Sequence, residues 1–387
     1  MGRGGLSVRW CKWVLWLVLG GVVLGGVPAN AEDALEVSAA SAVMMQADSG
    51  RILYQKDAHT PRAMASTTKI MTALLAAERL PLDRDVSVSA QAVRVEGTAL
   101  GLRGGDAISV RDLITGLLLA SGNDAANVLA QEVAGSQEAF AVLMNQRAVE
   151  IGMKHTHFVT PSGLDEEGHA STAYDMALLA REALKNGTIA AIVQQKSATI
   201  RLGSPKRAVT IANHNRLLQL YPDAIGMKTG FTKKAGRCLV SAAKRDDVTL
   251  IVVTLHCPND WDDHMHLYDV AFAKVKTVPL PMVKLPSLRV AGGDRAGVRL
   301  TIADSSPVAV MQDEAERIRT RLELPAFVWG GVKKGARVGW AIYALDGQEL
   351  ARVPVLATED AATLPVAGYA EQCARLFCRM LQGLLTW

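Results

Sequence analysis

Three short motifs hold the residues of this 387-residue chain whose types and spacing are best suited to chemistry. They are Ser66-Thr67-Thr68-Lys69, Ser121-Gly122-Asn123 and Lys228-Thr229-Gly230, in that order along the chain. A Ser-x-x-Lys string alone occurs by chance in a chain of this length, whereas the ordered set of three is far rarer. The set predicts a nucleophilic hydroxyl together with the groups that activate it and bind its substrate.

Ser66 and Lys69 are three residues apart, so on a helix they share one face and the amine can reach the hydroxyl. A hydroxyl is a weak nucleophile at neutral pH, and a lysine acts as its base only when it is neutral part of the time. Burial and a second cation both lower a lysine pKa, and Lys228 can be that cation. The alternative is a helix N-cap at Ser66 with a solvated Lys69, but the helix dipole disfavours a cation in the first turn.

Ser121-Gly122-Asn123 follows a predicted helix over residues 110–120. One interpretation is a helix C-cap with Gly122 in the left-handed conformation. The functional interpretation makes Ser121 a proton relay between Lys69 and a leaving amine, while the Asn123 amide orients Lys69 and the substrate carbonyl. Both interpretations place the motif at the end of a helix.

The third motif, extended by Phe231, lies in a strand-like stretch over residues 224–232. Gly230 has no side chain, so we expect a substrate backbone to lie against it as an added strand. Lys228 and Thr229 would then bind a terminal carboxylate. The alternative is a solvated sheet edge whose lysine protects against aggregation.

These motifs resemble those of the penicillin-recognising serine acyl-transferases. The closer resemblance is to the low-molecular-mass penicillin-binding proteins that are serine-type D-alanyl-D-alanine carboxypeptidases. It is carried by Ala65–Thr72, Ala120–Ala126, Thr160–Asp165 and Gly226–Thr232. It covers the first domain throughout, whereas the rest of the chain is similar only in plan.

The resemblance implies that Ser66 is acylated, Lys69 is its base, Ser121 relays the proton and Lys228 binds the substrate carboxylate. It also implies an oxyanion hole formed by the backbone N–H groups of Ser66 and Phe231. Some family members place an arginine upstream of the third motif. Here the corresponding stretch, residues 213–218, offers His214 or Arg216.

Two domains are expected from the change in pattern near residue 276. Residues 36–276 alternate helix-like and strand-like stretches, which predicts an α/β (α+β) domain of the β-lactamase/transpeptidase type, with an antiparallel sheet packed between helices. Residues 282–366 predict a small β-rich domain after a linker at Val278–Pro281. Within the first domain the patterns predict a hairpin over 41–54, helices over 66–79, 110–120 and 261–272, and antiparallel strands over 224–232, 238–243 and 248–255.

The first 31 residues have the plan of a secretory signal peptide, with three cations, an apolar run over residues 13–27 and a cut after Ala31. A retained membrane helix is the alternative, but the 15-residue run is shorter than the roughly 20 residues that cross a bilayer. Residues 370–387 predict an amphipathic helix that lies in the membrane surface, with docking on its own domain as the alternative. We therefore expect an exported protein at the outer face of the cytoplasmic membrane.

Composition excludes a nucleic-acid partner, because loss of the signal would lower the formal net charge from +4 to +1 and no Lys/Arg-rich stripe remains. The remaining cysteines, Cys238, Cys257, Cys373 and Cys378, permit disulfides without requiring them. For Cys238 and Cys257, two buried small hydrophobic residues is an equally good interpretation.

Three rival functions share some of these features. A β-lactamase needs a base for deacylation, and no E-x-x-L-N string occurs between residues 124 and 227. A non-catalytic penicillin-binding scaffold would have to retain every acylation residue unused. A zinc peptidase is suggested by His155 with His157 and His264 with His266, but H-E-x-x-H is missing and the latter pair is expected at a surface helix. We predict a carboxypeptidase that needs no metal or cofactor, acts on peptidoglycan stem peptides ending in D-Ala-D-Ala, and is acylated by β-lactams.

Overall fold

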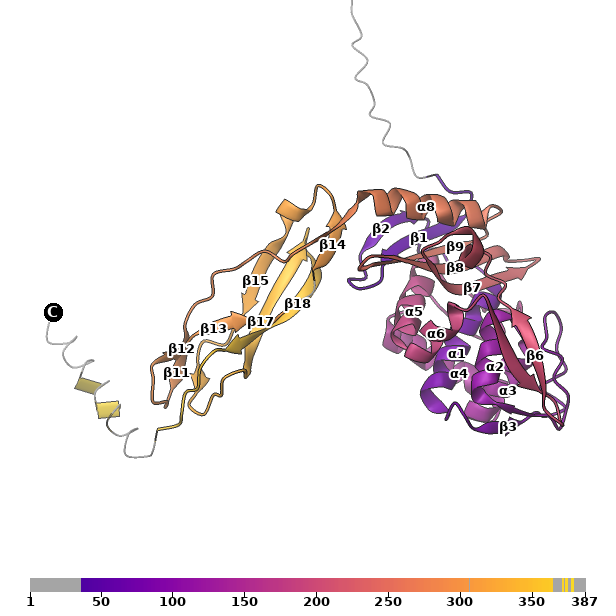
Figure 1. The fold of residues 1–387 in the computed structure, drawn as a ribbon, viewed down its shortest axis with the longest axis horizontal. Coiled ribbons are helices and arrows are strands. Elements are labelled where there is room, and N and C mark those ends of the chain that lie inside the picture. The colour runs from indigo at the N-terminus through magenta and orange to yellow at the C-terminus, as the bar shows by residue number, and fades with distance from the viewer. Residues whose placement is uncertain (1–35, 306, 365–370, 372, 375–376, 379–387) are drawn as a thin grey trace, which may run out of the picture. The chain divides into compact units, whose positions relative to one another are not determined.

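The computed structural model describes residues 36–305, 307–364, 371, 373–374 and 377–378 (Figure 1). The predicted signal over residues 1–31 and most of the predicted helix over 370–387 lie outside this range, so both stay predictions. No helix among the described residues is both long and apolar enough to span a bilayer.

A five-stranded antiparallel sheet forms the centre of the first domain, in the order β2-β1-β9-β8-β7. The strands are β1 (Ser41–Gln46), β2 (Ile52–Lys56), β7 (Ala224–Thr232), β8 (Gly236–Arg245) and β9 (Val248–Leu255). The predicted hairpin and the three consecutive antiparallel strands are confirmed. Nearly every residue of β9 is buried, which is typical of a strand covered on both faces. β7 lies at one edge of the sheet.

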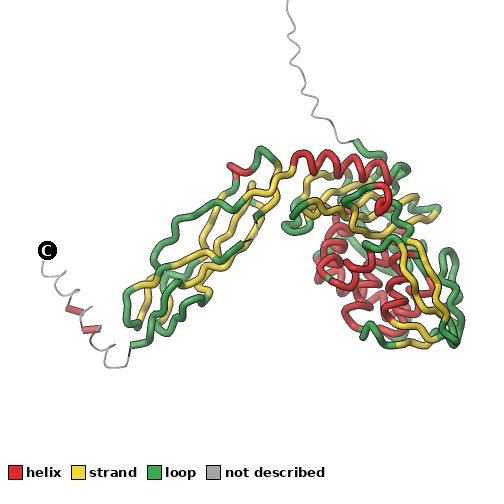
Figure 2. Tube along the Cα trace, in the orientation of Figure 1, coloured by secondary structure: helices red, strands yellow, loops and turns green. Residues whose placement is uncertain are grey.

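Helices cover both faces of this sheet, as predicted (Figures 1 and 2). The helices of the first domain are α1 (Lys69–Arg79), α2 (Val110–Leu119), α3 (Asn123–Ala134), α4 (Gln137–Ile151), α5 (Ala173–Lys185), α6 (Gly187–Val193), α7 (Leu217–Leu220) and α8 (Asp260–Lys274). On one side α5 packs on β1 and β9, and on the other α8 packs on β8 and β9. Two small hairpins are added, β3 (Asp85–Ser87) with β4 (Ala107–Ser109) and β5 (Ser197–Leu202) with β6 (Arg207–Ala212).

The first two turns of α1, from Lys69 to Ala76, are buried on every side. A helix that is buried all round belongs to the core, and here it packs against α2, α3 and α5. Lys69 therefore enters the protein interior on a core helix, which is unusual for a charged residue.

Residues 282–364 are β-rich, as predicted. A four-stranded sheet has the order β13-β18-β17-β15, and a three-stranded sheet has the order β12-β11-β16. The strands are β11 (Leu288–Ala291), β12 (Gly297–Val298), β13 (Leu300–Ile302), β15 (Arg319–Glu323), β16 (Val328–Trp329), β17 (Arg337–Leu345) and β18 (Gln348–Ala357). In β18 the alternate side chains of Val353, Val355 and Ala357 are buried, which is the pattern of a strand with one covered face.

The chain between the two predicted domains differs from a simple linker. Strand β10 (Val275–Val278) follows α8 directly and pairs in antiparallel register with β14 (Val308–Met311). Val278, expected to begin the linker, is therefore the last residue of a strand. Its partner Val308 lies 30 residues further along the chain, a separation that local patterns do not reveal.

Candidate active site

Ser66 lies in a 3-10 turn over Ala65–Thr68, and α1 begins only at Lys69. The predicted helix therefore starts three residues later than expected. Ala65 has a left-handed φ of 48°, and the turn is fixed by hydroxyl donation from Thr67 to the Met64 carbonyl at 2.6 Å and from Thr68 to the Ala65 carbonyl at 2.9 Å. Neither threonine caps α1; both hold the turn that presents Ser66.

The Lys69 amine lies at the centre of the site. Its Nζ is 2.8 Å from Ser66 Oγ, 2.7 Å from Asn123 Oδ1 and 2.5 Å from the Ser162 carbonyl oxygen. The amide and carbonyl oxygens can only accept, so they take two of the amine's N–H bonds. The third position faces Ser66, and in the neutral amine that position is the lone pair. The geometry thus suits removal of the Ser66 proton by Lys69.

Both lysines of the site have a pKa below the ordinary range. Burial of Lys69 holds its pKa well below the ordinary value, the charge of Lys228 lowers it further, as the sequence led us to expect, and Asp124 opposes both effects. Burial also lowers the pKa of Lys228 to about 7. Lys228 Nζ donates to the Thr229 carbonyl at 2.9 Å. A lysine base with a depressed pKa is what general-base work near neutral pH requires.

The Ser121 turn differs from the predicted one. Ser121 itself is left-handed, with φ of 63°, while Gly122 has an ordinary φ of −61°. Gly122 is needed for space instead, because a Cβ there would lie 2.7 Å from Leu100 Cγ and 2.9 Å from Asp124 Oδ1. A non-glycine residue in the left-handed region is unfavourable, and such conformations cluster at functional sites.

The start of α3 fixes the loop on the far side of Ser121. Asn123 Nδ2 donates to the Glu96 carbonyl at 2.6 Å, which directs its Oδ1 toward Lys69. The Asp124 carboxylate accepts backbone N–H bonds from residues 100, 101 and 102. The side chains of Asn123 and Asp124 are buried. They hold the loop over residues 96–102 against the site.

Gly230 has a different structural role from the one predicted. A Cβ at Gly230 would lie 3.0 Å from the Met64 carbonyl oxygen and 3.1 Å from the backbone nitrogens of both Ser66 and Thr67. The missing side chain therefore leaves room for the Ser66 turn rather than for a substrate. Edge strand β7 packs directly on that turn, which brings the backbone of Ser66 close to the segment that continues into Phe231.

A cavity of about 300 Å³ opens over Ser66. Its lining contains five of the predicted site residues, namely Ser66, Ser121, Thr229, Gly230 and Phe231. The other three, Lys69, Asn123 and Lys228, are buried below this surface. The structure thus brings all eight predicted residues into one region.

The lining also includes residues that the motifs did not point to. Thr98 comes from the loop held by Asn123 and Asp124, and its carbonyl accepts the Asn123 backbone N–H at 2.8 Å. Of the two candidates upstream of the third motif, His214 lines the cavity, whereas Arg216 is not part of the lining. The lining is completed by Arg237, Asp260 and Trp261.

His169 is a positioning residue that no sequence motif singles out. Its Nδ1 accepts the backbone N–H groups of Val159 at 2.9 Å and Thr160 at 3.3 Å, so the ring proton is on Nε2, 2.9 Å from Thr68 Oγ1. Burial lowers the pKa of His169 to about 4, which keeps it neutral. His169 therefore connects the loop that supplies the Ser162 carbonyl to the turn that presents Ser66.

Gly163 completes that connection. It has a φ of 83°, and a Cβ there would lie 2.0 Å from the Ala65 carbonyl oxygen. The stretch Thr160–Asp165, which carried part of the family resemblance, thus packs backbone to backbone on the Ser66 turn.

The zinc alternative has no support in the part of the chain that the structure describes, where no three His, Cys, Asp or Glu side chains are grouped to hold a metal. His264 is fully buried, with its ring nitrogens 2.6 Å from Ser241 Oγ and 2.9 Å from Thr254 Oγ1. His264 and His266 both lie on the expected helix α8, and His266 is exposed, but His264 is buried rather than at the surface. Cys238 and Cys257 are free and buried.

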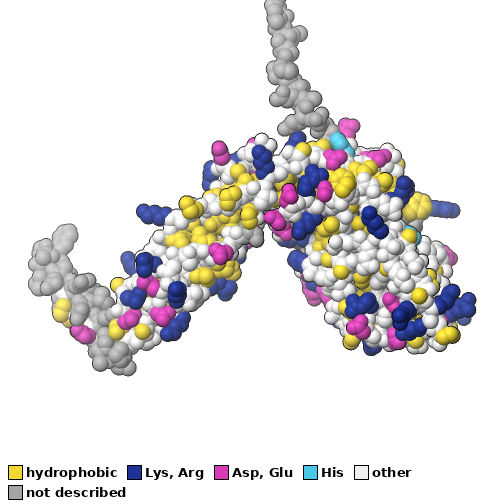
Figure 3. Space-filling model, in the orientation of Figure 1, with side chains coloured by type: hydrophobic (Ala, Val, Ile, Leu, Met, Phe, Trp, Pro, Cys, Tyr) yellow, Lys and Arg dark blue, Asp and Glu magenta, His cyan; other side chains and the backbone are white. Residues whose placement is uncertain are grey.

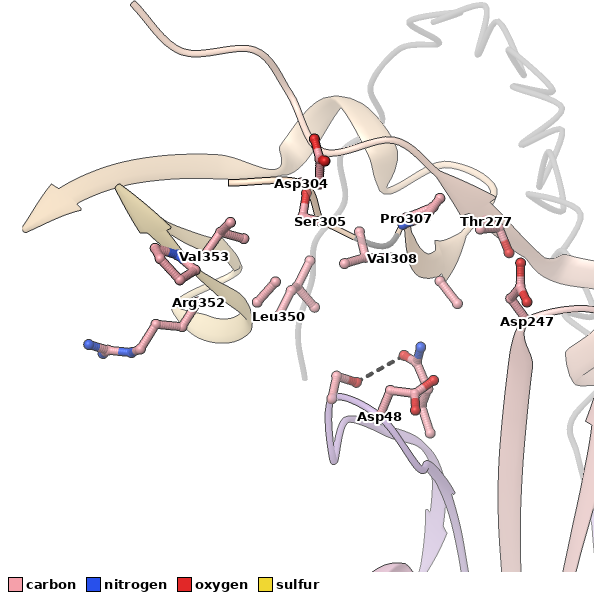
Figure 4. A pocket seen from close by; sticks show the side chains of 15 residues that line it. Asp48, Asp247, Thr277, Asp304, Ser305, Pro307, Val308, Leu350, Arg352 and Val353 are labelled. Atoms are coloured by element: carbon pink, nitrogen blue, oxygen red, sulfur yellow. Dashed lines mark hydrogen bonds between the residues drawn. The ribbon is translucent and has the colours of Figure 1, made fainter. Parts of the chain in front are cut away.

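A second cavity, of about 600 Å³, is larger but has different chemistry. Its lining includes Asp48, Asp247, Asp304 and Arg352 and no residue of the three motifs (Figure 4). No lysine lines it beside a serine hydroxyl. We therefore place the site by the chemistry of the smaller cavity rather than by volume.

Comparison with known proteins supports the assignment of the three motifs to a serine carboxypeptidase site. The family model described as D-alanyl-D-alanine carboxypeptidase matches residues 28–259, and the model described as penicillin-binding protein 5, C-terminal domain, matches residues 283–363. The chain is 33% identical over 335 residues to D-alanyl-D-alanine carboxypeptidase DacF of Bacillus subtilis, covering 83% of this chain and 85% of that protein.

It is also 33% identical over 349 residues to D-alanyl-D-alanine carboxypeptidase DacC of Escherichia coli, covering 85% of each. Among solved structures it is similar to penicillin binding protein 5 from Haemophilus influenzae, with 27% identity, a TM-score of 0.70, and coverage of 84% of this chain and 98% of that one. The chain therefore belongs to the D-alanyl-D-alanine carboxypeptidase family of low-molecular-mass penicillin-binding proteins, which are serine peptidases.

Proposed function

We propose that this enzyme removes the terminal D-alanine from peptidoglycan stem pentapeptides through an acyl-enzyme on Ser66. The observation that carries the proposal is the 2.8 Å hydrogen bond between Ser66 Oγ and the buried Lys69 amine, at the floor of the cavity. A neutral lysine in that position is a base for the hydroxyl, and the hydroxyl faces the space where a substrate can bind.

In the first step Lys69 Nζ takes the Ser66 proton while Oγ attacks the carbonyl carbon of the penultimate D-alanine. The carbonyl oxygen gains charge between the backbone N–H groups of Ser66 and Phe231. Ser121 then passes a proton from Lys69 to the nitrogen of the terminal D-alanine, and the C–N bond breaks. Water hydrolyses the ester and restores the Ser66 hydroxyl.

Lys228, Thr229 and His214 are proposed to bind the carboxylate of the terminal D-alanine. Thr229 and His214 line the cavity, and Lys228 is buried directly below, in the same strand as Thr229. Burial, with the charge of Lys228 as a smaller cause, lowers the pKa of His214, so the imidazole contributes hydrogen bonding rather than charge. A substrate carboxylate would in turn favour the charged form of Lys228.

β-Lactams are proposed to acylate Ser66 through the same geometry. Opening of the ring by Ser66 gives the same kind of ester, but the leaving amine stays tethered to the acyl group. The enzyme would therefore be held at the acyl stage instead of turning over.

The test compares wild type with Ser66→Ala, and with Ser287→Ala as a matched control, since Ser287 is an exposed serine of the β-rich region. We expect D-alanine release from a pentapeptide and labelling by a fluorescent penicillin to be lost in Ser66→Ala and kept in Ser287→Ala. A labelled Ser66→Ala protein would refute the assignment. Sustained penicillin turnover by wild type would favour a β-lactamase, and a wild type that is never labelled would favour a scaffold.

We also propose that the enzyme is exported by residues 1–31 and held at the membrane surface by residues 370–387. The first segment has the signal-peptide plan, and the second places apolar and basic residues at helical spacing. The mass of the mature protein and its partition between membrane and soluble fractions test this. Deletion of residues 370–387 should move it to the soluble fraction; unchanged membrane association would contradict the anchor.

A further inference from the structure

One end of the active-site cavity is not used by the proposed reaction. Arg237, Asp260 and Trp261 line the same cavity as Ser66, but none of them belongs to the three motifs. Arg237 is in β8, and the other two begin α8. The following inference rests on the proposed function and concerns what binds at this end.

The direction of the substrate decides which part of it lies there. β7 is an edge strand, so a substrate backbone can add alongside it. With the terminal carboxylate at Lys228 and Thr229 and the reacting carbonyl at the Phe231 N–H group, the residues before the reacting bond continue past Phe231. Phe231 pairs with Arg237 across the β7–β8 ladder. This pairing puts the two side chains on one face of the sheet, and both line the cavity, so the acyl side of the substrate passes within reach of Arg237.

Arg237 is held in place before any ligand binds. Its Nε and Nη2 donate to Asp260 Oδ1 at 2.9 and 2.5 Å, and its guanidinium carbon lies 5.4 Å from the centre of the Trp261 ring. The Asp260 side chain is 4% exposed, whereas that of Arg237 is 41% exposed. The ion pair does not involve Nη1, which leaves a fixed donor group available at the cavity.

The neighbouring side chains add apolar surface. Phe231 is 67% exposed at the rim, and Trp261 is partly exposed beside the guanidinium. An exposed aromatic next to a preorganised guanidinium suits a long side chain with an aliphatic stem and a carboxylate at its end. A preorganised donor loses less conformational entropy on binding than a free arginine would.

We infer that Phe231, Arg237 and Trp261 form a subsite that selects a carboxylate-bearing side chain on the residue preceding D-Ala-D-Ala. Because Asp260 already balances the charge of Arg237, selection comes from hydrogen-bond geometry more than from net charge. The subsite would distinguish stem peptides by their third residue, a property that the three motifs do not determine.

The experiment uses three peptides that differ only in the side chain before D-Ala-D-Ala: 2-aminopimelic acid, its side-chain carboxamide, and Nε-acetyl-lysine. D-Alanine release is measured for the full chain as kcat and KM separately. We expect kcat/KM of wild type to be about tenfold higher for the carboxylate peptide, mainly through a lower KM. In Arg237→Gln this preference should disappear, and Arg237→Lys should keep only part of it.

Arg245→Gln is the matched control. Arg245 is in the same strand, is ion-paired with Asp223 and lies 4.5 Å from the Phe272 ring, but it does not line the cavity. The preference of the Arg245→Gln variant for the carboxylate peptide should equal that of wild type. Equal kcat/KM for all three peptides, or a preference that survives in Arg237→Gln, would overturn the subsite while leaving the carboxypeptidase function standing. No release from any peptide by wild type would overturn both.

Discussion

The two parts of the molecule use charge in opposite ways. In residues 37–274, polar and charged side chains are buried from Ser41 to His264, among them Lys69 and Lys228. Beyond residue 275, Glu314 is the one buried polar residue of the described chain. Charged side chains of the β-rich part lie at its surface (Figure 3), and Arg321 with Glu323 is one such exposed pair.

This difference indicates that the buried charges of the first part serve catalysis, whereas the exposed charges of the second part have little effect on either catalysis or stability. Burying a charge costs folding free energy unless it is well paired, so a protein keeps buried charges mainly where the chemistry needs them. Exposed ion pairs cost little and contribute little. The comparison predicts that removing a buried charge from the Ser66 site changes catalysis, and that removing an exposed charge from the second part changes almost nothing.

Lys69→Met is the most severe test. It keeps an aliphatic side chain of similar length but removes the base, so acylation of Ser66 by penicillin should fall by at least about 10³-fold. The free energy of unfolding in urea should change little, because Met removes an amine that is costly to bury but also removes the donor to Asn123 and Ser162. Lys333→Met, at an exposed lysine of the β-rich part, should alter neither quantity. Acylation within tenfold of wild type would exclude Lys69 as the base.

His169 makes the first part sensitive to acid. Its pKa falls from 6.5 to about 4 on folding, mainly through burial, with the charge of His157 lowering it and that of Asp165 raising it. The unfolded chain therefore binds a proton in this window that the folded protein does not. The stability contributed by neutral His169 is present above pH 6.5 and is lost as pH falls toward 4, by on the order of 3 kcal/mol.

His169→Gln should therefore flatten the decrease in unfolding free energy between pH 6.5 and 4, measured by urea titration at several pH values. The exposed His266, on α8, provides the control variant His266→Gln, which should keep the wild-type slope. Identical slopes in His169→Gln and wild type would rule out a buried neutral His169.

A single methyl group tests how closely β7 must pack on the Ser66 turn. Gly230→Ala places Cβ 3.0 to 3.1 Å from three backbone atoms of that turn, so the turn or the strand must shift. We expect acylation to slow by about 10- to 100-fold, because small displacements of reacting groups are costly. Gly187→Ala, whose Cβ would meet nothing within 4 Å, should leave acylation unchanged. A Gly230→Ala enzyme as fast as wild type would show that this contact does not position the oxyanion donors.

Local patterns predicted most elements of the first part and the eight residues that gather at the Ser66 cavity, because motif spacing and hydrophobic periodicity are properties of short segments. The lowered pKa of Lys69 was also predicted from the motifs, and both of its expected causes, burial and the charge of Lys228, are confirmed. What the sequence could not reveal depends on distant contacts. His169 acts on Thr68, 101 residues away, and nothing in its own surroundings marks it.

Two glycines also show that distant contacts cannot be predicted from the sequence alone. A residue-type rule assigns positive φ to Gly122, but Leu100 and Asp124 occupy the space beside it, and the strained conformation falls on Ser121. Likewise Gly230 was expected to make room for substrate, whereas it makes room for the turn that carries Ser66. The sequence predicts that a glycine is needed; the packing partner decides why.

The smallest expected effect lies in the β-rich part. Arg321→Ala removes a cation whose side chain is 71% exposed and whose partner Glu323 is 41% exposed. The unfolding free energy should change by no more than about 0.5 kcal/mol. The rate of penicillin acylation should equal that of wild type, because neither residue lines the Ser66 cavity. A slower acylation, or a loss of stability comparable to that expected for His169, would mean that surface charge in the β-rich part supports the site, and the division between the two parts would fail.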